Sequence, residues 1–189
     1  MESPQLANAL LHEFQRCRDA FNFYVALQSK IVAKNNDKKI AISCYNAYMD
    51  FVSHLYEFYL GNITKRENCR NAKGKEVDKI INNEVEKLLI KKIEGIKRGE
   101  AHQYENDISY YDVTVPEEFG REFRAVRNMR SHAGHERSEY DLASFFIKYH
   151  RFVYILFEYP HWLWSAEEFP DHDWLAIERF ANAIAAKDT

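Results

Sequence analysis

Apolar residues recur at three- and four-residue steps through most of this chain, and this spacing limits its possible folds more than any other feature. Such steps place the apolar side chains on one face of an α-helix. The chain holds only six glycines and four prolines, too few for the many turns of a β-sandwich or barrel. The sequence therefore predicts an all-α fold, with long helices within residues 4–33, 41–61, 77–96, 114–134 and 138–160 and a short one near 171–186.

Capping and breaking residues predict where these helices begin and end. Serine or threonine before an apolar run indicates a start, and glycine or proline after the run indicates an end. We expect starts at Ser3, Thr114 and Ser138, and ends at Gly61 and Pro160.

The length of 189 residues and the hydrophobic content of 46% suit one folded domain over residues 1–189. A short polar turn at 34–37 makes the first two helices antiparallel neighbours. We therefore expect an up-and-down bundle of five to six helices, with residues 99–114 as a long connector.

The composition also bounds where the protein works. The three cysteines (Cys17, Cys44 and Cys69) contain no C-x-x-C pair, so reduced thiols in a cytoplasm are expected. The chain begins without the basic and apolar regions of a signal peptide. Its most apolar stretch, 145–164, holds three charged residues, so we expect a core helix and no contact with a membrane. The net charge of −3 argues against general attraction to nucleic acid but allows a local basic site.

Residues 121–135 carry the strongest functional signal: Arg-Glu-Phe-Arg-Ala-Val-Arg-Asn-Met-Arg-Ser-His-Ala-Gly-His. At 100° per residue, the buried side of this helix would hold Phe119, Phe123, Val126, Met129 and Ala133. A second, polar stripe would hold Arg121, Arg124, Asn128, His132 and His135, with Arg127 on its flank.

These side chains suit the cleavage of RNA by its own 2'-hydroxyl. Histidine transfers protons near neutral pH, which fits His132 as acid or base. Arginine holds two phosphate oxygens and stabilises the charge that builds on them, which fits Arg127. Asn128 can orient either partner by hydrogen bonding. A local positive field and further phosphate contacts would come from Arg121, Arg124, Arg130 and His135.

The hexapeptide Arg127-Asn128-Met129-Arg130-Ser131-His132, late in the chain and followed by another long helix, resembles the R-x(4–6)-H motif of HEPN domains. The resemblance implies a helical bundle, commonly a homodimer with two motifs facing each other. It also implies a metal-independent ribonuclease without a cofactor, of the kind found in toxin–antitoxin and anti-phage systems. Arg127 and His132 would then be catalytic with support from Asn128, RNA would be the substrate, and an antitoxin or regulatory protein a further partner. HEPN toxins paired with nucleotidyltransferase antitoxins usually carry a tyrosine two residues after the histidine. Gly134 stands there, so silencing through that tyrosine is not expected.

Other interpretations of the same residues stay open. A non-catalytic HEPN module would bind RNA, a nucleotide or a protein partner, and an unrelated helical adaptor would carry Arg127 and His132 as ordinary surface residues. His132-x-x-His135 offers half of a zinc site, but no nearby ligands complete it, so no metal is expected. Asp50, His54 and Glu57 lie at helical spacing and could approach the motif, although an ordinary polar face is the simpler interpretation.

Overall fold

The computed structural model describes residues 4–33, 37–66, 74–101, 105, 107–131, 140–164 and 175–185. Within these residues there are seven helices and no strands. They are α1 (Pro4–Val32), α2 (Lys38–Arg66), α3 (Lys75–Lys97), α4 (Ile108–Tyr111), α5 (Phe119–Ser131), α7 (Leu142–Trp164) and α8 (Leu175–Ala185). The predicted all-α class is confirmed. The predicted number of five to six helices is not, because the connector after α3 itself contains α4.

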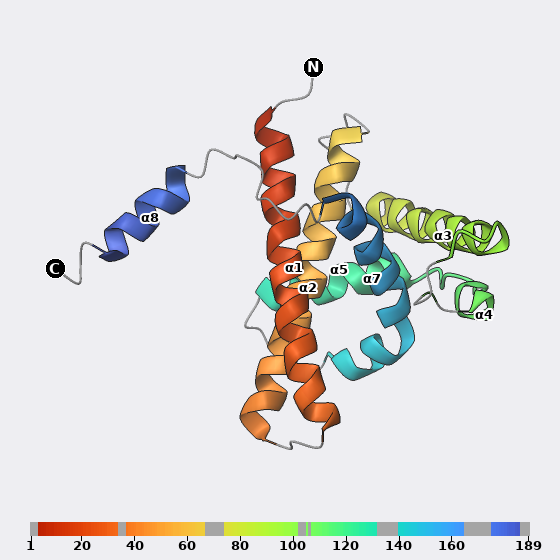
Figure 1. Ribbon diagram of the computed structural model, residues 1–189, viewed down its shortest axis with the longest axis horizontal. Coiled ribbons are helices and arrows are strands. Elements are labelled where there is room, and N and C mark those ends of the chain that lie inside the picture. The colour runs from red at the N-terminus through yellow and green to blue at the C-terminus, as the bar shows by residue number, and fades with distance from the viewer. Residues whose placement is uncertain are drawn as a thin grey trace.

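Helices α1 and α2 form a long antiparallel pair, and α5 crosses α2 while α3 lies to one side (Figure 1). Helix α5 packs on both α2 and α3, and α7 completes the core. The largest fully buried side chains include Phe51 of α2 and both Phe119 and Phe123 of α5. Helix α5, which carries most of the predicted motif, is therefore fixed by contacts on several sides. In the described part of the chain, no helix has the length and apolar character needed to cross a membrane.

The predicted end of α2 at Gly61 is wrong, because the helix continues to Arg66. A Cβ atom at position 61 would lie 2.5 Å from Cδ2 of Leu10 on α1. Gly61 thus gives the two long helices room to approach each other. The close packing of α1 on α2 at this position offsets the destabilising effect that a glycine usually has inside a helix.

The predicted end of α7 at Pro160 is also wrong, since the helix runs on to Trp164 with Pro160 inside it. Proline lacks the N–H that would bond the carbonyl four residues earlier, here that of Leu156. The hydroxyl of Tyr59 on α2 donates to that carbonyl at 2.7 Å instead. A tertiary hydrogen bond therefore replaces the one that proline removes.

The starts of α5 and α7 also differ from the predicted ones. Helix α5 begins at Phe119, five residues after Thr114. Helix α7 begins at Leu142, where the Asp141 carboxylate accepts from the backbone N–H of Ser144 at 3.0 Å. Asp141 is thus the capping residue in place of the predicted Ser138, since caps bond the free N–H groups of the first turn. Ser138 itself lies outside the described residues, as do Ser3 and Cys69.

The first turn of α5 is held by a residue of α3. The Asn82 side chain accepts from the backbone N–H of Gly120 at 2.8 Å and donates to the carbonyl of Glu117 at 2.7 Å. Two backbone groups at the helix start are satisfied by one amide. Gly120 allows this contact, because a Cβ there would lie 2.4 Å from the Asp78 carbonyl oxygen.

An imidazole is built into the aromatic core between α1, α2 and α7. The ring of His150 stacks on Phe146 with centroids 4.5 Å apart, and its Nδ1 lies 3.2 Å from the hydroxyl of Tyr48. Burial lowers the pKa of His150 to about 4. The ring is therefore neutral at pH 7 and packs as an aromatic residue.

The free energy of unfolding is expected to fall as the pH drops from 6.5 to 4. In that range the unfolded chain protonates His150 while the folded protein does not, so the unfolded state binds more protons. One such group contributes a slope of up to about 1.4 kcal/mol per pH unit. Urea titrations at several pH values in this range give the free energy of unfolding at each pH. This free energy should change less with pH in His150→Phe than in the unchanged protein. Equal slopes in the two would contradict the prediction.

Candidate functional site

The predicted buried side of the motif helix is confirmed where the structure describes it. Phe119, Phe123 and Val126 are fully buried, and Met129 packs partly buried against the same core. Ala133 lies outside the described residues. The opposite side of α5 is thereby turned away from the core, as the helical spacing requires.

Arg127 and Asn128 lie together in the second half of α5. Nη1 of Arg127 donates to Oδ1 of Asn128 at 3.1 Å, and its Nε donates to Oε1 of Glu57 on α2. The guanidinium also lies 6.0 Å from the ring centre of Tyr56, within reach of a cation–π contact. About 38% of the Arg127 side chain remains exposed. The guanidinium is thus held on several sides and still open to a ligand.

The predicted motif continues past Ser131, the last residue of α5 that the structure describes. His132, Gly134 and His135 are outside the described residues. The pairing of Arg127 with His132 and a phosphate contact from His135 therefore stay predictions.

Arg124 is bound to α3 by a two-armed ion pair. Its Nε and Nη2 donate to the two carboxylate oxygens of Asp78 at 2.9 and 2.8 Å. This bonding raises the pKa of Arg124. Asp78 is buried, so removing its partner would strand a charge away from water. A phosphate would have to displace Asp78 to reach the same edge of Arg124. Asp78 therefore competes with the phosphate contact that the sequence predicts for Arg124.

Arg121 and Arg130 also have carboxylate neighbours. Arg130 pairs with Asp50 of α2 at 2.5 Å, and the exposed Arg121 pairs with adjacent Glu122 at 2.8 Å. Every arginine of α5 therefore has an acidic partner. The positive field predicted for this helix is offset by these carboxylates, and the roles of Arg121 and Arg130 in phosphate binding stay predictions.

The polar residues of α2 divide between two neighbours. Asp50 and Glu57 reach the arginines of α5, whereas His54 turns to α1, where its Nδ1 lies 2.6 Å from Oε1 of Glu13. The simpler interpretation of all three as an ordinary polar face does not describe Asp50 and Glu57. These two residues belong to the surroundings of the motif.

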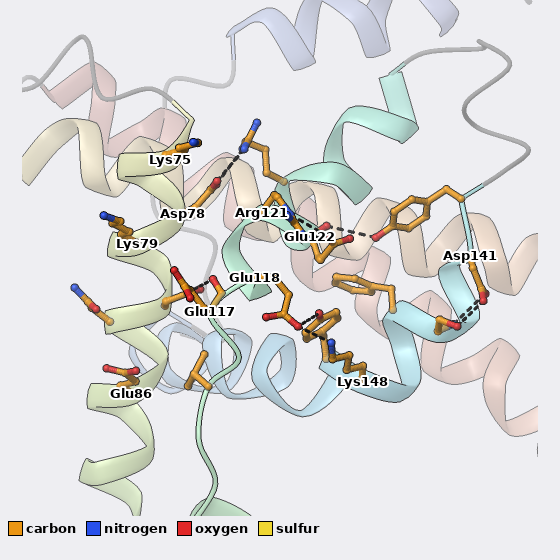
Figure 2. A pocket seen from close by; sticks show the side chains of 18 residues that line it. Lys75, Asp78, Lys79, Glu86, Glu117, Glu118, Arg121, Glu122, Asp141 and Lys148 are labelled. Atoms are coloured by element: carbon orange, nitrogen blue, oxygen red, sulfur yellow. Dashed lines mark hydrogen bonds and ion pairs between the residues drawn. The ribbon is translucent and has the colours of Figure 1, made fainter.

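A large groove lies at the other end of α5, between α3 and the start of α7 (Figure 2). It has a volume of about 1220 Å³. Arg121 and Arg124 line it, but Arg127, Asn128 and Arg130 do not. Its walls carry six acidic and five basic side chains: Asp78, Glu86, Glu117, Glu118, Glu122 and Asp141 against Lys75, Lys79, Arg121, Arg124 and Lys148. This mixed charge does not form the continuous basic surface that tracks a nucleic-acid backbone.

Glu118, just before α5, is bonded to the α7 wall of this groove. Its Oε1 accepts from Nζ of Lys148 at 2.5 Å and from the hydroxyl of Tyr149 at 3.2 Å, both on α7 (Figure 2). The hydrogen bond from Lys148 is the largest cause that lowers the pKa of Glu118 to about 2. These contacts join the residue just before α5 to α7, which suits a structural junction.

Three residues of this region were absent from the predicted site or assigned to it weakly. Glu57, Asp78 and Asn82 contact α5 from other helices and are separated from it in sequence by 35 residues or more. Gly120 is the sequence signal that could have pointed to them, because a glycine inside a helical pattern can have a packing reason. Among the described residues, no group of three or more histidine, cysteine or acidic side chains is arranged to hold a metal ion.

No family model, curated protein or solved structure matches this chain.

Proposed function

We propose that this chain is a HEPN-like endoribonuclease that cuts RNA without a metal ion. The 2'-hydroxyl would attack the adjacent phosphate, leaving a 2',3'-cyclic phosphate and a 5'-hydroxyl. A proton would pass from the 2'-hydroxyl to the leaving 5'-oxygen with His132 as acid or base, and Arg127 would clamp the phosphate with support from Asn128. A group that transfers protons and a cation at one phosphodiester suffice for this chemistry without a cofactor.

One observation carries this proposal: the arginine of the Arg-Asn-x-x-x-His segment is held in place yet partly exposed. Arg127 bonds Asn128 and Glu57, and the structure describes α5 as far as Ser131. A helix of this length fixes the direction of its side chains through the packed face. The positioned cation is what the reaction needs, since catalysis by charge works best when the group need not reorient.

The proposal includes a homodimer that brings two copies of the motif together and a regulatory protein that restrains the activity. A function in a toxin–antitoxin or anti-phage system would explain why a nuclease needs such a partner.

Purified protein is expected to cut a single-stranded RNA oligonucleotide in the presence of EDTA. The same oligonucleotide with one 2'-deoxy sugar should lose the cut at that position, because the attacking hydroxyl is missing. Mass spectrometry of the fragments should show 2',3'-cyclic phosphate and 5'-hydroxyl ends. Cleavage that stops on chelation, or continues at the 2'-deoxy position, would contradict the proposed reaction.

A second candidate is a non-catalytic HEPN-like module that binds RNA, a nucleotide or a protein. The observation in its favour is the acidic partner of each arginine in α5. These carboxylates reduce the field available to an anionic substrate. Binding of the oligonucleotide without any cleavage would favour this candidate.

A further inference from the structure

We propose that Glu57 is a positioning residue, which orients the Arg127 guanidinium toward an RNA phosphate. The inference rests on the proposed function and adds a residue from α2 to the site. Glu57 would touch neither the substrate nor the reacting atoms. It would act only through Arg127.

The contacts of Arg127 leave a usable edge of its guanidinium. An arginine has five N–H donors in a planar fork. Glu57 takes the one on Nε, and Asn128 takes one on Nη1. Among the described residues, Nη2 contacts no acceptor. The remaining donors on Nη1 and Nη2 can therefore bind two phosphate oxygens while Glu57 and Asn128 stay in place.

Arg124 on the same helix shows the contrasting arrangement. Its Nε and Nη2 are both bound to Asp78, so the Nε–Nη2 edge of the Arg124 guanidinium is already occupied. The Asp78 side chain is only 10% exposed, whereas that of Glu57 is 36% exposed. The pair on α3 joins two helices. Glu57 on α2 holds the partly exposed Arg127 through one hydrogen bond only, from Nε.

Glu57 sits on a rigid part of α2, which is what a positioning residue needs. The preceding residue, Tyr56, is buried and packs edge-on against Phe123 with ring centres 5.3 Å apart. Its ring also faces Arg127. Two consecutive residues of α2 therefore contact the same guanidinium. The Arg127 side chain is therefore already ordered and loses less rotational freedom when a phosphate binds.

Glu57 has two opposite effects on phosphate binding: its hydrogen bond orients Arg127, and its negative charge repels the phosphate. A carboxylate beside Arg127 weakens the attraction of that arginine for a phosphate. A glutamine at this position would keep an acceptor for Nε and remove the negative charge. Alanine would remove both. Glu57→Gln and Glu57→Ala therefore carry the same charge and differ only in the group that orients Arg127.

The test compares these two variants in the binding of a 2'-O-methyl RNA oligonucleotide, which cannot be cleaved, and in the cleavage of ordinary RNA. Glu57→Ala is expected to bind about tenfold more weakly than Glu57→Gln, which corresponds to one hydrogen bond to a charged group. Its kcat for cleavage should fall by a similar factor, and Glu57→Gln should restore it. Glu94→Gln and Glu94→Ala, a matched pair at an exposed site on α3, should bind equally well.

The outcomes separate this inference from the proposed function. Equal binding and equal kcat of the two Glu57 variants would overturn the positioning role while the nuclease stands. Binding without cleavage by the unchanged protein would refute the nuclease, and the alanine–glutamine contrast in binding would still decide the role of Glu57. A protein that neither binds nor cleaves RNA would overturn both.

Discussion

Replacing Gly120 by alanine is expected to lower the free energy of unfolding by about 3 kcal/mol. The new Cβ would lie 2.4, 2.7 and 2.8 Å from the carbonyl oxygen, Cα and carbonyl carbon of Asp78. These are backbone atoms of α3 and cannot rotate away, so the α3–α5 crossing must open. The bonds from Asn82 to the start of α5 would lengthen with it. Urea denaturation of the two proteins measures the difference.

Gly95→Ala is the matched control for this change. Gly95 also lies in a helix, but the nearest atom to its added Cβ is a side-chain oxygen of Glu100 at 3.9 Å. Alanine there should raise the free energy of unfolding by about 0.5 kcal/mol, because it favours the helix more than glycine does. The same substitution thus has opposite signs at the two sites. A shift of equal sign and size in both would show that the close approach at Gly120 does not limit stability.

The helices themselves follow from the sequence, because their spacing records which face is buried. Phe119, Phe123 and Val126 of α5 were assigned to the core from periodicity alone and are fully buried. Their positions depend only on the geometry of one helix. Such local information is contained in a short stretch of sequence.

The boundaries were harder to predict, because partners from other helices offset the local cost of a breaking residue. Pro160 continues α7 since Tyr59 bonds the carbonyl that proline leaves free. Gly61 continues α2 since Leu10 packs against it. Tyr59 and Leu10 lie far from these positions along the chain. Periodicity and capping rules cannot detect them.

Some residues of the candidate site could likewise be proposed from the sequence, and others could not. Arg127 and Asn128 were proposed from the sequence because they are adjacent in a recognisable segment, and the structure shows that their side chains are bonded to each other. Glu57 was considered and set aside, since a carboxylate at helical spacing is usually a solvated surface residue. Only the crossing of α2 and α5 brings it to Arg127. Residues of one segment can thus be proposed as a site from the sequence, whereas contacts to them from other helices require the tertiary structure.

Replacing His132 or Arg127 by alanine is expected to lower the rate of RNA cleavage by about 10²- to 10⁴-fold. The histidine would no longer move the proton, and the arginine would no longer hold the charge on the phosphate. The double variant should lose little more than the single ones, because groups that act on one transition state do not contribute additively. Single-turnover cleavage of a labelled oligonucleotide gives the rates directly.

Two further variants make this comparison specific to the site. Arg127→Lys keeps the charge but cannot bind two oxygens through a planar fork, so it should remain well below the unchanged protein. Arg98→Ala removes an exposed arginine that pairs with Glu100 at the end of α3, and it should cleave at the normal rate. If His132→Ala still cleaves like the unchanged protein, while circular dichroism shows both to be folded, the imidazole cannot be the proton-transfer group. Cleavage would then have to arise from other residues or from a contaminating nuclease.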